Sequence, residues 1–288
     1  MLMSSSPWLT PQLEACAEAL ESPRALASWK ELYLGFDLGT TNLVVVAVNE
    51  EGFPLSAVLE SSQSSVRDGV VVDYWAAVQG MRKALERLSR KLGVTELKAV
   101  GAAAYPPGIS AKTAKICANV VETLGFDCLG LYEEPTAAAV ALNMERGAII
   151  DIGGGTTGIS VLDEGQVLYT ADEPTGGTHM TLVLAGSRGI SFDEAETLKR
   201  DRNEQRRFAP VLKPVLEKMA TIARDHLERS GHLGGMPIVL VGGGADLPGA
   251  EEILSSVVGH RVDLAPEPLL VTPLGIALSL WRDRRDGS

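Results

Sequence analysis

One pattern of residues occurs twice in this chain of 288 residues. Residues 32–48, LYLGFDLGTTNLVVVAV, read as strand, Gly/Thr turn and strand, and residues 148–169, AIIDIGGGTTGISVLDEGQVLY, repeat that order and add a third strand. Asp37 and Asp151 stand before the equivalent turns, too far apart for a solenoid repeat of about 20–50 residues. The spacing fits a duplicated domain, so we predict an α/β protein with two related lobes.

Helical patterns follow the first copy of this motif. Apolar residues recur at helical spacing over 76–92 and 111–124, with strands predicted at 97–104 and 128–132. This strand-helix-strand order predicts parallel crossover connections. In EEPTAAAVALNM, Pro135 is predicted at the first position of a further helix, where its missing N–H costs little.

Three segments are predicted along the chain. Residues 1–30 form an N-terminal helical arm. Residues 31–147 form lobe I together with residues 270–288, because the apolar tail reads as a last helix that returns to this lobe. Residues 148–269 form lobe II.

The charge balance and the cysteines exclude several classes of protein. The 37 acidic and 26 basic residues give a net charge of −11, which disfavours binding to nucleic acid and to anionic lipid. Cys16, Cys117 and Cys128 are too widely spaced for a CxxC metal site, and their odd number does not fit a disulfide framework. The sequence shows neither a secretory signal nor an apolar run of membrane-spanning length. We therefore expect a cytoplasmic protein without a membrane span.

Glycine-rich turns carry the chemistry of this sequence. The spacing GxGxxG at 153–158 matches the dinucleotide fingerprint, but a strand rather than a helix follows it, so the fingerprint does not apply. A P-loop is also absent, because neither Gly/Thr turn ends in Gly-Lys-Ser/Thr. A third turn, GGGADLPG at 242–249, accompanies the turns at 37–42 and 151–157.

These turns suit phosphate groups. Glycines let backbone N–H groups approach phosphate oxygens, and threonine hydroxyls add donors without bulk. Asp37 and Asp151 can hold a hydrated Mg²⁺, which proteins bind through one or two carboxylates together with phosphates. One such turn alone would be an ordinary tight hairpin. Three of them predict a nucleotide held by both lobes.

Five segments, in this order, resemble the ATP-site motifs of the actin-like ATPase superfamily: DLGTTN, EEPTAAAVAL, DIGGGTTGIS, VLVGGGADLPG and PLGIAL. The chain is similar to the DnaK-type chaperone ATPase, and VRDGVVVDY and DEPTGGTHMTLVLAG resemble the EutJ family of ethanolamine-utilisation proteins more closely still. The resemblance implies a two-lobed actin-like ATPase fold. In that fold, duplicated ribonuclease-H-like domains enclose a nucleotide cleft.

The resemblance also implies roles for individual residues. Asp37 and Asp151 would position Mg²⁺, largely through water, while Thr156 contacts phosphate and Glu134 orients the attacking water. The residues implied to bind ATP or ADP are Gly39, Thr40, Thr41, Asn42, Gly153, Gly154, Gly155, Thr157, Gly176, Gly177, Glu217, Lys218, Gly242, Gly243, Gly244 and Asp246. Within this set, Glu217 and Lys218 are also explained by a charge pair on a helix surface.

Departures from the family pattern bear on activity. DnaK-type ATPases place a catalytic lysine after the first hairpin, whereas Arg67 is the only cation between Glu31 and Met81. Transition-state charge is then less well neutralised, and we expect slow hydrolysis. The acidic residues that follow the Gly176-Gly177 loop in DnaK are replaced here by Thr178-His179-Met180-Thr181, and His179 is interpreted as a structural polar residue. We expect no β-rich peptide-binding domain like that of DnaK after the last of these motifs.

These features favour an ATP-binding, slowly hydrolysing, chaperone-like assembly or reactivation factor. Its protein client is expected among ethanolamine-utilisation enzymes or their bacterial microcompartment, as the resemblance implies. A filament-forming actin-like protein of the cell-shape or division type is the first alternative, and it would sediment with ATP. A small-molecule kinase is the second alternative. It needs an aspartate base and a substrate hydroxyl, and ATP turnover stimulated by a metabolite would favour it.

Overall fold

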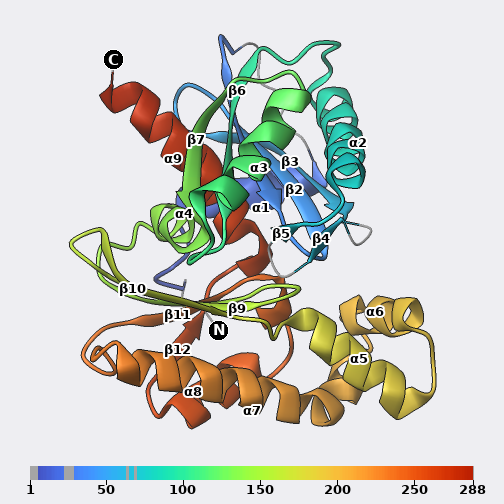
Figure 1. The fold of residues 1–288 in the computed structure, drawn as a ribbon, viewed down its shortest axis with the longest axis vertical. Coiled ribbons are helices and arrows are strands. Elements are labelled where there is room, and N and C mark those ends of the chain that lie inside the picture. The colour runs from blue at the N-terminus through green and yellow to red at the C-terminus, as the bar shows by residue number, and fades with distance from the viewer. Residues whose placement is uncertain (1–5, 23–28, 63–64, 68–69, 288) are drawn as a thin grey trace, which may run out of the picture. The chain divides into compact units, whose positions relative to one another are not determined.

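The computed structural model describes residues 6–22, 29–62, 65–67 and 70–287. Contacts group the chain into two compact units. The first unit comprises Met1–Met144 together with Ala265–Ser288, and the second comprises Glu145–Leu264. Each unit is described below by itself, with the element labels of Figure 1.

The first unit contains a five-stranded sheet, counted over the described residues, in the order β3-β2-β1-β6-β7. Its strands are β1 (Leu32–Leu38), β2 (Asn42–Val48), β3 (Pro54–Ser61), β6 (Ala99–Tyr105) and β7 (Cys128–Glu133). β1, β2 and β3 pair antiparallel, whereas β6 and β7 continue the sheet parallel to β1. The C-terminal ends of β1 and β7 therefore reach the same edge. β4 (Val66–Arg67) and β5 (Val70–Val71) form a separate small hairpin.

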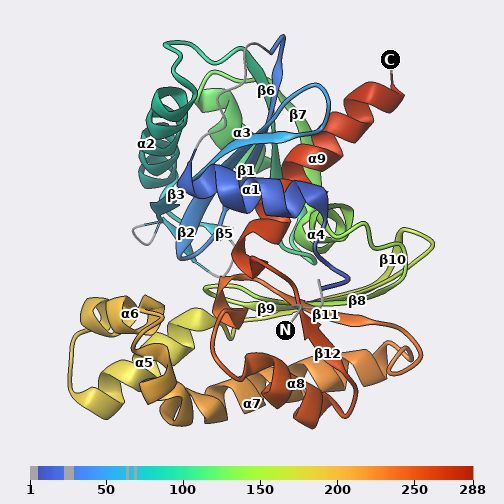
Figure 2. The same ribbon diagram turned by 180° about the vertical axis from the view of Figure 1, so that it is seen from behind.

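Helices cover both faces of this sheet (Figures 1 and 2). They are α1 (Pro11–Glu21), α2 (Tyr74–Leu92), α3 (Ala111–Thr123), α4 (Glu134–Ala141) and α9 (Val271–Asp286), with the short 3-10 helix η2 (Pro268–Leu270) before α9. The even-numbered residues of β1 pack with α2 and α3, because side chains alternate between the faces of a strand. The opposite face packs with α4 and α9 through a cluster that includes Ile276 and Leu280.

Glycines let α9 lie directly on its neighbours. A Cβ atom added at Gly35 in β1 would come within 2.7 Å of the backbone nitrogen of Ala277 in α9. A Cβ atom at Gly275 in α9 would collide with the backbone of Ala137 in α4. The helix at the C-terminal side of the chain is thus part of the core of the first unit.

The segment expected to form a separate arm contains α1, which packs against β3. Leu13, Cys16 and Ala19 on this helix are fully buried. Lys91 of α2 donates a hydrogen bond to the carbonyl oxygen of Leu20 at 2.5 Å. α1 therefore contributes to the first unit.

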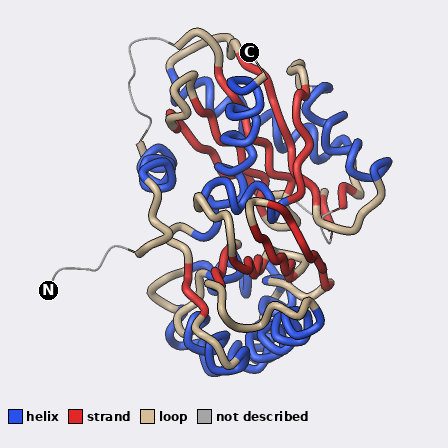
Figure 3. Tube along the Cα trace, turned by 90° about the vertical axis from the view of Figure 1, so that its left-hand side faces the viewer, coloured by secondary structure: helices blue, strands red, loops and turns tan. Residues whose placement is uncertain are grey.

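The second unit repeats the strand order of the first as β10-β9-β8-β11-β12. Its strands are β8 (Gly147–Ile152), β9 (Thr157–Asp163), β10 (Gln166–Glu173), β11 (Ile238–Val241) and β12 (Val262–Leu264). β8, β9 and β10 pair antiparallel, and β11 and β12 pair parallel to β8 and to each other. Figure 3 shows the strands of both sheets in red. The duplicated α/β architecture predicted from the repeated turn is confirmed.

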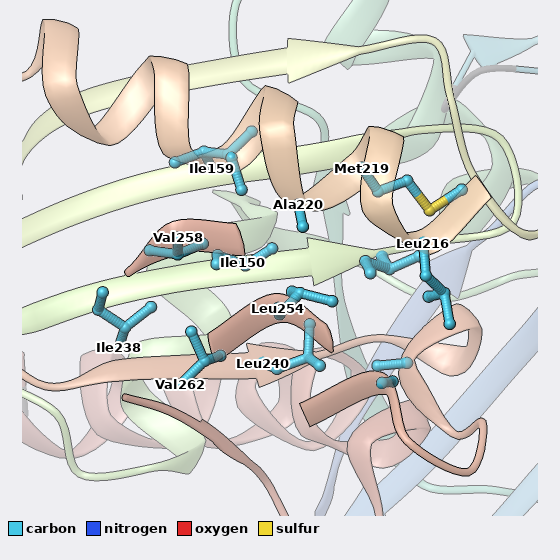
Figure 4. Packing of buried hydrophobic residues seen from close by; sticks show 14 of the residues in the cluster. Ile150, Ile159, Leu216, Met219, Ala220, Ile238, Leu240, Leu254, Val258 and Val262 are labelled. Atoms are coloured by element: carbon cyan, nitrogen blue, oxygen red, sulfur yellow. The ribbon is translucent and has the colours of Figure 1, made fainter. Parts of the chain in front are cut away.

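Long helices pack on one face of the second sheet. The helical elements are α5 (Gly177–Arg188), α6 (Phe192–Arg200), α7 (Gln205–Arg229), η1 (Gly243–Ala245) and α8 (Ala250–Val258). Figure 4 shows Leu216, Met219 and Ala220 of α7 and Leu254 of α8 among the buried strand residues. This core fixes the end of β8, from which the candidate site begins.

Two helix starts differ from the sequence prediction. α2 begins before residue 76, because the carboxylate of Asp73 accepts a hydrogen bond from the N–H of Ala76 at 2.9 Å and caps the helix. α4 begins at Glu134, so Pro135 occupies its second position. Among the described residues, no helix is both long and apolar enough to cross a bilayer.

Candidate functional site

Backbone hydrogen bonds join the glycine turn after β8 to the turn before α5. Gly153 donates its N–H to the carbonyl oxygen of Thr156 at 2.9 Å. Gly177 donates to the carbonyl oxygen of Gly153 at 2.9 Å, and Thr178 donates to that of Gly154 at 2.8 Å. We call residues 153–156 and 176–178 the glycine platform. It lies at the C-terminal end of β8, the end at which open α/β sheets bind ligands.

Three successive N–H groups of the glycine platform have no acceptor in the part of the protein that the structure describes. They belong to Gly154, Gly155 and Thr156, of which Gly155 is buried and the other two are half-buried. Successive backbone N–H groups form concavities that bind anions, phosphate among them. The platform can therefore accept phosphate oxygens, and the sequence analysis named these three residues for that role.

The two turns of the glycine platform pack too closely for a side chain at position 176, and the hydroxyl of Thr157 joins them. A Cβ atom at Gly176 would lie 2.7 Å from the carbonyl carbon of Gly155 and from the nitrogen of Thr156. The side chain of Thr157 is buried, and its hydroxyl donates to the carbonyl oxygen of Thr175 at 2.6 Å. The hydroxyl of Thr157, named from the sequence as a nucleotide contact, thus ties the two turns together.

The third glycine segment packs on the same end of β8. A Cβ atom at Gly242, where φ is +90°, would overlap the carboxylate of Asp151. A Cβ atom at Gly244 would lie 2.8 Å from the carbonyl oxygen of Ile152. The structure therefore brings residues 242–244 to the glycine platform, as the sequence predicts for a shared site.

Two carboxylates share a face of the second sheet beside the platform. Asp151 in β8 pairs with Gly158 in β9, which pairs in turn with Asp172 in β10. A Cβ atom at Gly158 would lie 3.6 Å from Oδ1 of Asp172 and 3.8 Å from Cβ of Asp151. Carboxylate oxygens near a phosphate-binding turn fit a hydrated magnesium ion. Asp172 is not among the site residues predicted from the sequence.

An ion pair between Lys199 and Glu196 contacts the glycine platform at Gly177. The ammonium of Lys199 in α6 donates to the carbonyl oxygen of Gly177 at 3.0 Å, to Thr181 Oγ1 at 2.8 Å and to Glu196 Oε2 at 2.7 Å. The side chains of Lys199 and Glu196 are only 11% and 18% exposed. Their three-residue spacing on one helix was a signal in the sequence, but charges so spaced usually face solvent.

Burial and charge shift the pKa values of this pair. Burial lowers the pKa of Lys199, and the neighbouring Glu196 carboxylate opposes that shift. For Glu196, burial favours a higher pKa, but the charge of Lys199 and the hydrogen bonds from Lys199, Thr181 and Arg200 together outweigh it, and the pKa falls below its usual value. Glu196 therefore stays ionised at neutral pH and holds the lysine in place.

Glu217 and Asp246, two other charged candidates of the second unit, have partners of their own. Glu217 lies on α7, where its carboxylate is 3.7 Å from the ammonium of Lys213. Its neighbour Lys218 is exposed on the same helix. The carboxylate of Asp246 forms an ion pair with Arg202 at 2.9 Å. Of these, Asp246 follows directly on η1 and the glycines at 242–244.

The first unit carries the equivalent turn between β1 and β2. A Cβ atom at Gly39 would lie 2.7 Å from the carbonyl oxygen of Asn42, so the turn is tight. Thr40, Thr41 and Asn42 are half-buried at this turn. Asp37 precedes it near the end of β1, as Asp151 does in β8.

Asp37 and Glu134 of the first unit both act on the buried thiol of Cys117. Burial, and to a smaller extent the negative charges of Glu134 and Asp37, raises the pKa of Cys117 to about 12. Glu134 begins α4 immediately after β7, at the end of the sheet where β1 also ends. Of the three carboxylates expected to take part in catalysis, Asp37 and Glu134 therefore lie at one end of this sheet, and Asp151 belongs to the second unit.

Family models of two kinds match parts of the chain. The model of type IV pilus assembly protein PilM matches residues 138–269, and that of MreB/Mbl protein matches residues 61–185. MreB 5 of Spiroplasma citri, solved with AMPPNP, superposes with a TM-score of 0.72 at 18% identity, over 91% of this chain and all of that one. These matches show the actin-like ATPase fold.

Relatives of higher identity span nearly the whole chain. Ethanolamine utilization protein EutJ of Escherichia coli K12 is 39% identical over 97% of this chain and 96% of its own length. The crystal structure of EutJ from Carboxydothermus hydrogenoformans is 41% identical and superposes with a TM-score of 0.84, covering 93% of this chain and 96% of that protein. With two units of one topology, paired glycine turns and this identity over almost its full length, the chain belongs to the EutJ family of ethanolamine utilization proteins, within the actin-like ATPase superfamily.

Proposed function

We propose that the protein binds Mg-ATP and hydrolyses it slowly, and that it uses this cycle to assemble or reactivate enzymes of ethanolamine utilisation. The observation that carries the nucleotide part is the run of N–H groups at Gly154, Gly155 and Thr156, beside the carboxylate of Asp151. Such a run supplies donors to phosphate oxygens, while the carboxylate supplies a ligand for the accompanying cation. Solved relatives of the same fold are bound to AMPPNP, ADP or ADPNP.

Each residue has a defined part in this proposal. Thr156 and the glycines of the platform hold phosphate oxygens, and in the first unit Thr40 and Thr41 add donors. Asp151 and Asp37 hold a hydrated Mg²⁺, and that ion would neutralise phosphate charge when bound. Glu134 accepts a hydrogen bond from the attacking water and orients it, as a general base does.

Slow hydrolysis is expected because the segment around the first hairpin contains only one cation. Arg67 is the only cation between Glu31 and Met81 in the sequence, and it lies on β4 with an exposed side chain. A mobile, hydrated side chain stabilises developing charge less well than a preorganised cation. We therefore propose that binding and release of nucleotide, rather than rapid turnover, set the state of the protein.

The names of the curated relatives support a proposal for the client protein. The curated relatives are named for ethanolamine utilization, and we propose that the client is an enzyme of that system or a protein of its microcompartment. Capture experiments with the protein loaded with ATP and with ADP, in a cell extract that expresses the ethanolamine enzymes, would test this. Recovery of no such protein in either state would contradict the proposed client.

Thermal unfolding with nucleotide tests the binding site. At about 100 times its dissociation constant, Mg-ATP should stabilise the protein by about 2.7 kcal/mol. The variant Asp151→Asn should lose the part of this shift that depends on Mg²⁺. Asp163→Asn is the matched control, because Asp163 ends β9 with its side chain 41% exposed and only a 3.6 Å ion pair with Arg146. Absence of any shift with ATP or ADP at millimolar concentration would refute nucleotide binding.

A further inference from the structure

The register of three neighbouring strands places Asp172 beside Asp151. Asp151 of β8 pairs with Gly158 of β9, and Gly158 pairs with Asp172 of β10. Residues that pair directly across neighbouring strands project their side chains from the same face of the sheet. The two aspartates therefore flank Gly158, which has no side chain of its own. All three residues are half-buried, so this part of the face is partly accessible to solvent.

Gly158 leaves a space between the two aspartates. A Cβ atom there would lie 3.6 Å from Oδ1 of Asp172 and 3.8 Å from Cβ of Asp151, and beyond its chain neighbours it would meet no further atom of the described residues within 4 Å. Glycine weakens the interior of a strand, where it marks a bulge, a tight bend or the close approach of a backbone or a ligand. Pairing is regular on both sides of Gly158, and no other backbone packs on it. The approach of a ligand is the explanation that fits this glycine.

The donor set around this space suits a magnesium ion. Among the described residues, no group of three or more histidine, cysteine, aspartate or glutamate side chains gathers into a metal site. Magnesium needs no such group, because it keeps several of its waters and is bound by one or two carboxylates together with the phosphates of a nucleotide. Asp151 and Asp172 supply two carboxylates, and the glycine platform at the end of β8 supplies the phosphate-binding turn.

We propose that Asp172 is a positioning residue for the magnesium ion that accompanies the nucleotide. Together with Asp151 it holds the hydrated cation over Gly158, where a side chain would occupy the space. The inference rests on the proposed nucleotide binding. It goes further by assigning a second carboxylate of the second unit to the cation and by giving a reason for the glycine at position 158.

The variant Asp172→Asn keeps the size of the side chain and removes its charge. With Mg²⁺ present, we expect this variant to bind AMPPNP about tenfold more weakly than wild type, because one of the charges that attract the cation is lost. With EDTA in place of Mg²⁺, it should bind AMPPNP as tightly as wild type or more tightly, because a charge that repels phosphate is gone. Titration calorimetry in the two buffers measures both affinities. A purely structural role of Asp172 would lower both affinities together.

Two further variants complete the experiment. Gly158→Ala places a methyl group between the aspartates in ordinary contact with both, so the strand should fold, and the factor by which Mg²⁺ raises the affinity for AMPPNP should fall. Asp163→Asn is the control, because it removes a carboxylate from the other end of β9, where the side chain is 41% exposed. It should change neither affinity.

The outcomes separate this inference from the proposed function. The inference is wrong, while the proposed function stands, if Asp172→Asn binds AMPPNP as wild type does in Mg²⁺, or if it loses affinity equally in both buffers. It is also wrong if Mg²⁺ does not raise the affinity of wild type. If Asp172→Asn does not fold, an unchanged effect of Mg²⁺ in Gly158→Ala overturns the inference, and a reduced effect supports it. If wild type binds AMPPNP in neither buffer, the proposed function is wrong and the inference falls with it.

Discussion

Replacing Gly176 by alanine tests whether the glycine platform is as tightly packed as its geometry indicates. The new methyl group would lie 2.7 Å from the carbonyl carbon of Gly155 and the nitrogen of Thr156, and both are backbone atoms that cannot rotate away. Overpacking of this kind costs about 1–3 kcal/mol. The variant should therefore be destabilised, and the turn at 176–178 should move off the turn at 153–156.

Gly186→Ala is the matched control, because the same change is made in the helix that Gly176 caps. Gly186 lies inside α5, and a Cβ atom there would meet nothing within 4 Å. Alanine in a helix interior is favoured over glycine by about 0.5–1 kcal/mol, so this variant should be slightly more stable than wild type. The two alanine variants should then differ by about 1.5–4 kcal/mol in the free energy of unfolding.

Urea denaturation followed by circular dichroism would measure this difference, and calorimetry with Mg-AMPPNP would measure the functional effect. We expect Gly176→Ala to bind nucleotide at least about tenfold more weakly, since a shift of even one ångström in a positioned site has a large cost. Gly186→Ala should bind as wild type does. Equal stability and equal binding of the two variants would show that the contact between the turns is loose, and the reasoning from the platform geometry would be refuted.

Three further predictions concern single side chains. Lys199→Met should destabilise the protein by about 1.5–3 kcal/mol, because the carboxylate of Glu196 loses one of its two cationic partners and keeps only Arg200. The double variant Lys199→Met with Glu196→Gln should recover part of this loss in a double-mutant cycle. Glu134→Gln should lower the rate of ATP hydrolysis, measured as phosphate release, by about 10²-fold with little change in nucleotide affinity. The control Glu133→Gln should release phosphate at the rate of wild type. If both variants hydrolyse ATP at the same rate, Glu134 has no catalytic role. Burial raises the pKa of Cys16 from 9.0 to about 12, so the folded form retains the thiol proton and loses stability as pH rises from 9 to 12; Cys16→Ala should show a smaller loss in alkaline unfolding curves.

The turns of this protein could be predicted from the sequence because their residues allow few other structures. DLGTTN and DIGGGTT each stand between runs of β-branched and other apolar residues, and only glycine permits the close backbone approach seen at Gly39 and Gly176. The repeat then fixed the topology, since two copies of one motif form two sheets of one strand order.

The charged residues near the platform were harder to predict. Glu196 and Lys199 look like an ordinary exposed pair on α6, and only the packing of α6 against α5 buries them. Glu217 and Lys218 on α7 were named from the resemblance to DnaK-type ATPases, and that resemblance gave no indication of the pair on α6. Asp172 likewise depends on the register of β10 with β9, which a single sequence does not specify.

The close packing of α9 against Gly35 of β1, and through its own Gly275 against α4, has a consequence for synthesis on the ribosome. Residues 271–286 are made after the entire second unit, yet they complete the core of the first. At about 5–20 residues per second, the ribosome takes several seconds to pass from one to the other. During that interval the strands of the second unit can already pair, while the face of β1 around Gly35 is not yet covered by α9. The first unit, although most of it is synthesised first, is therefore expected to finish folding last.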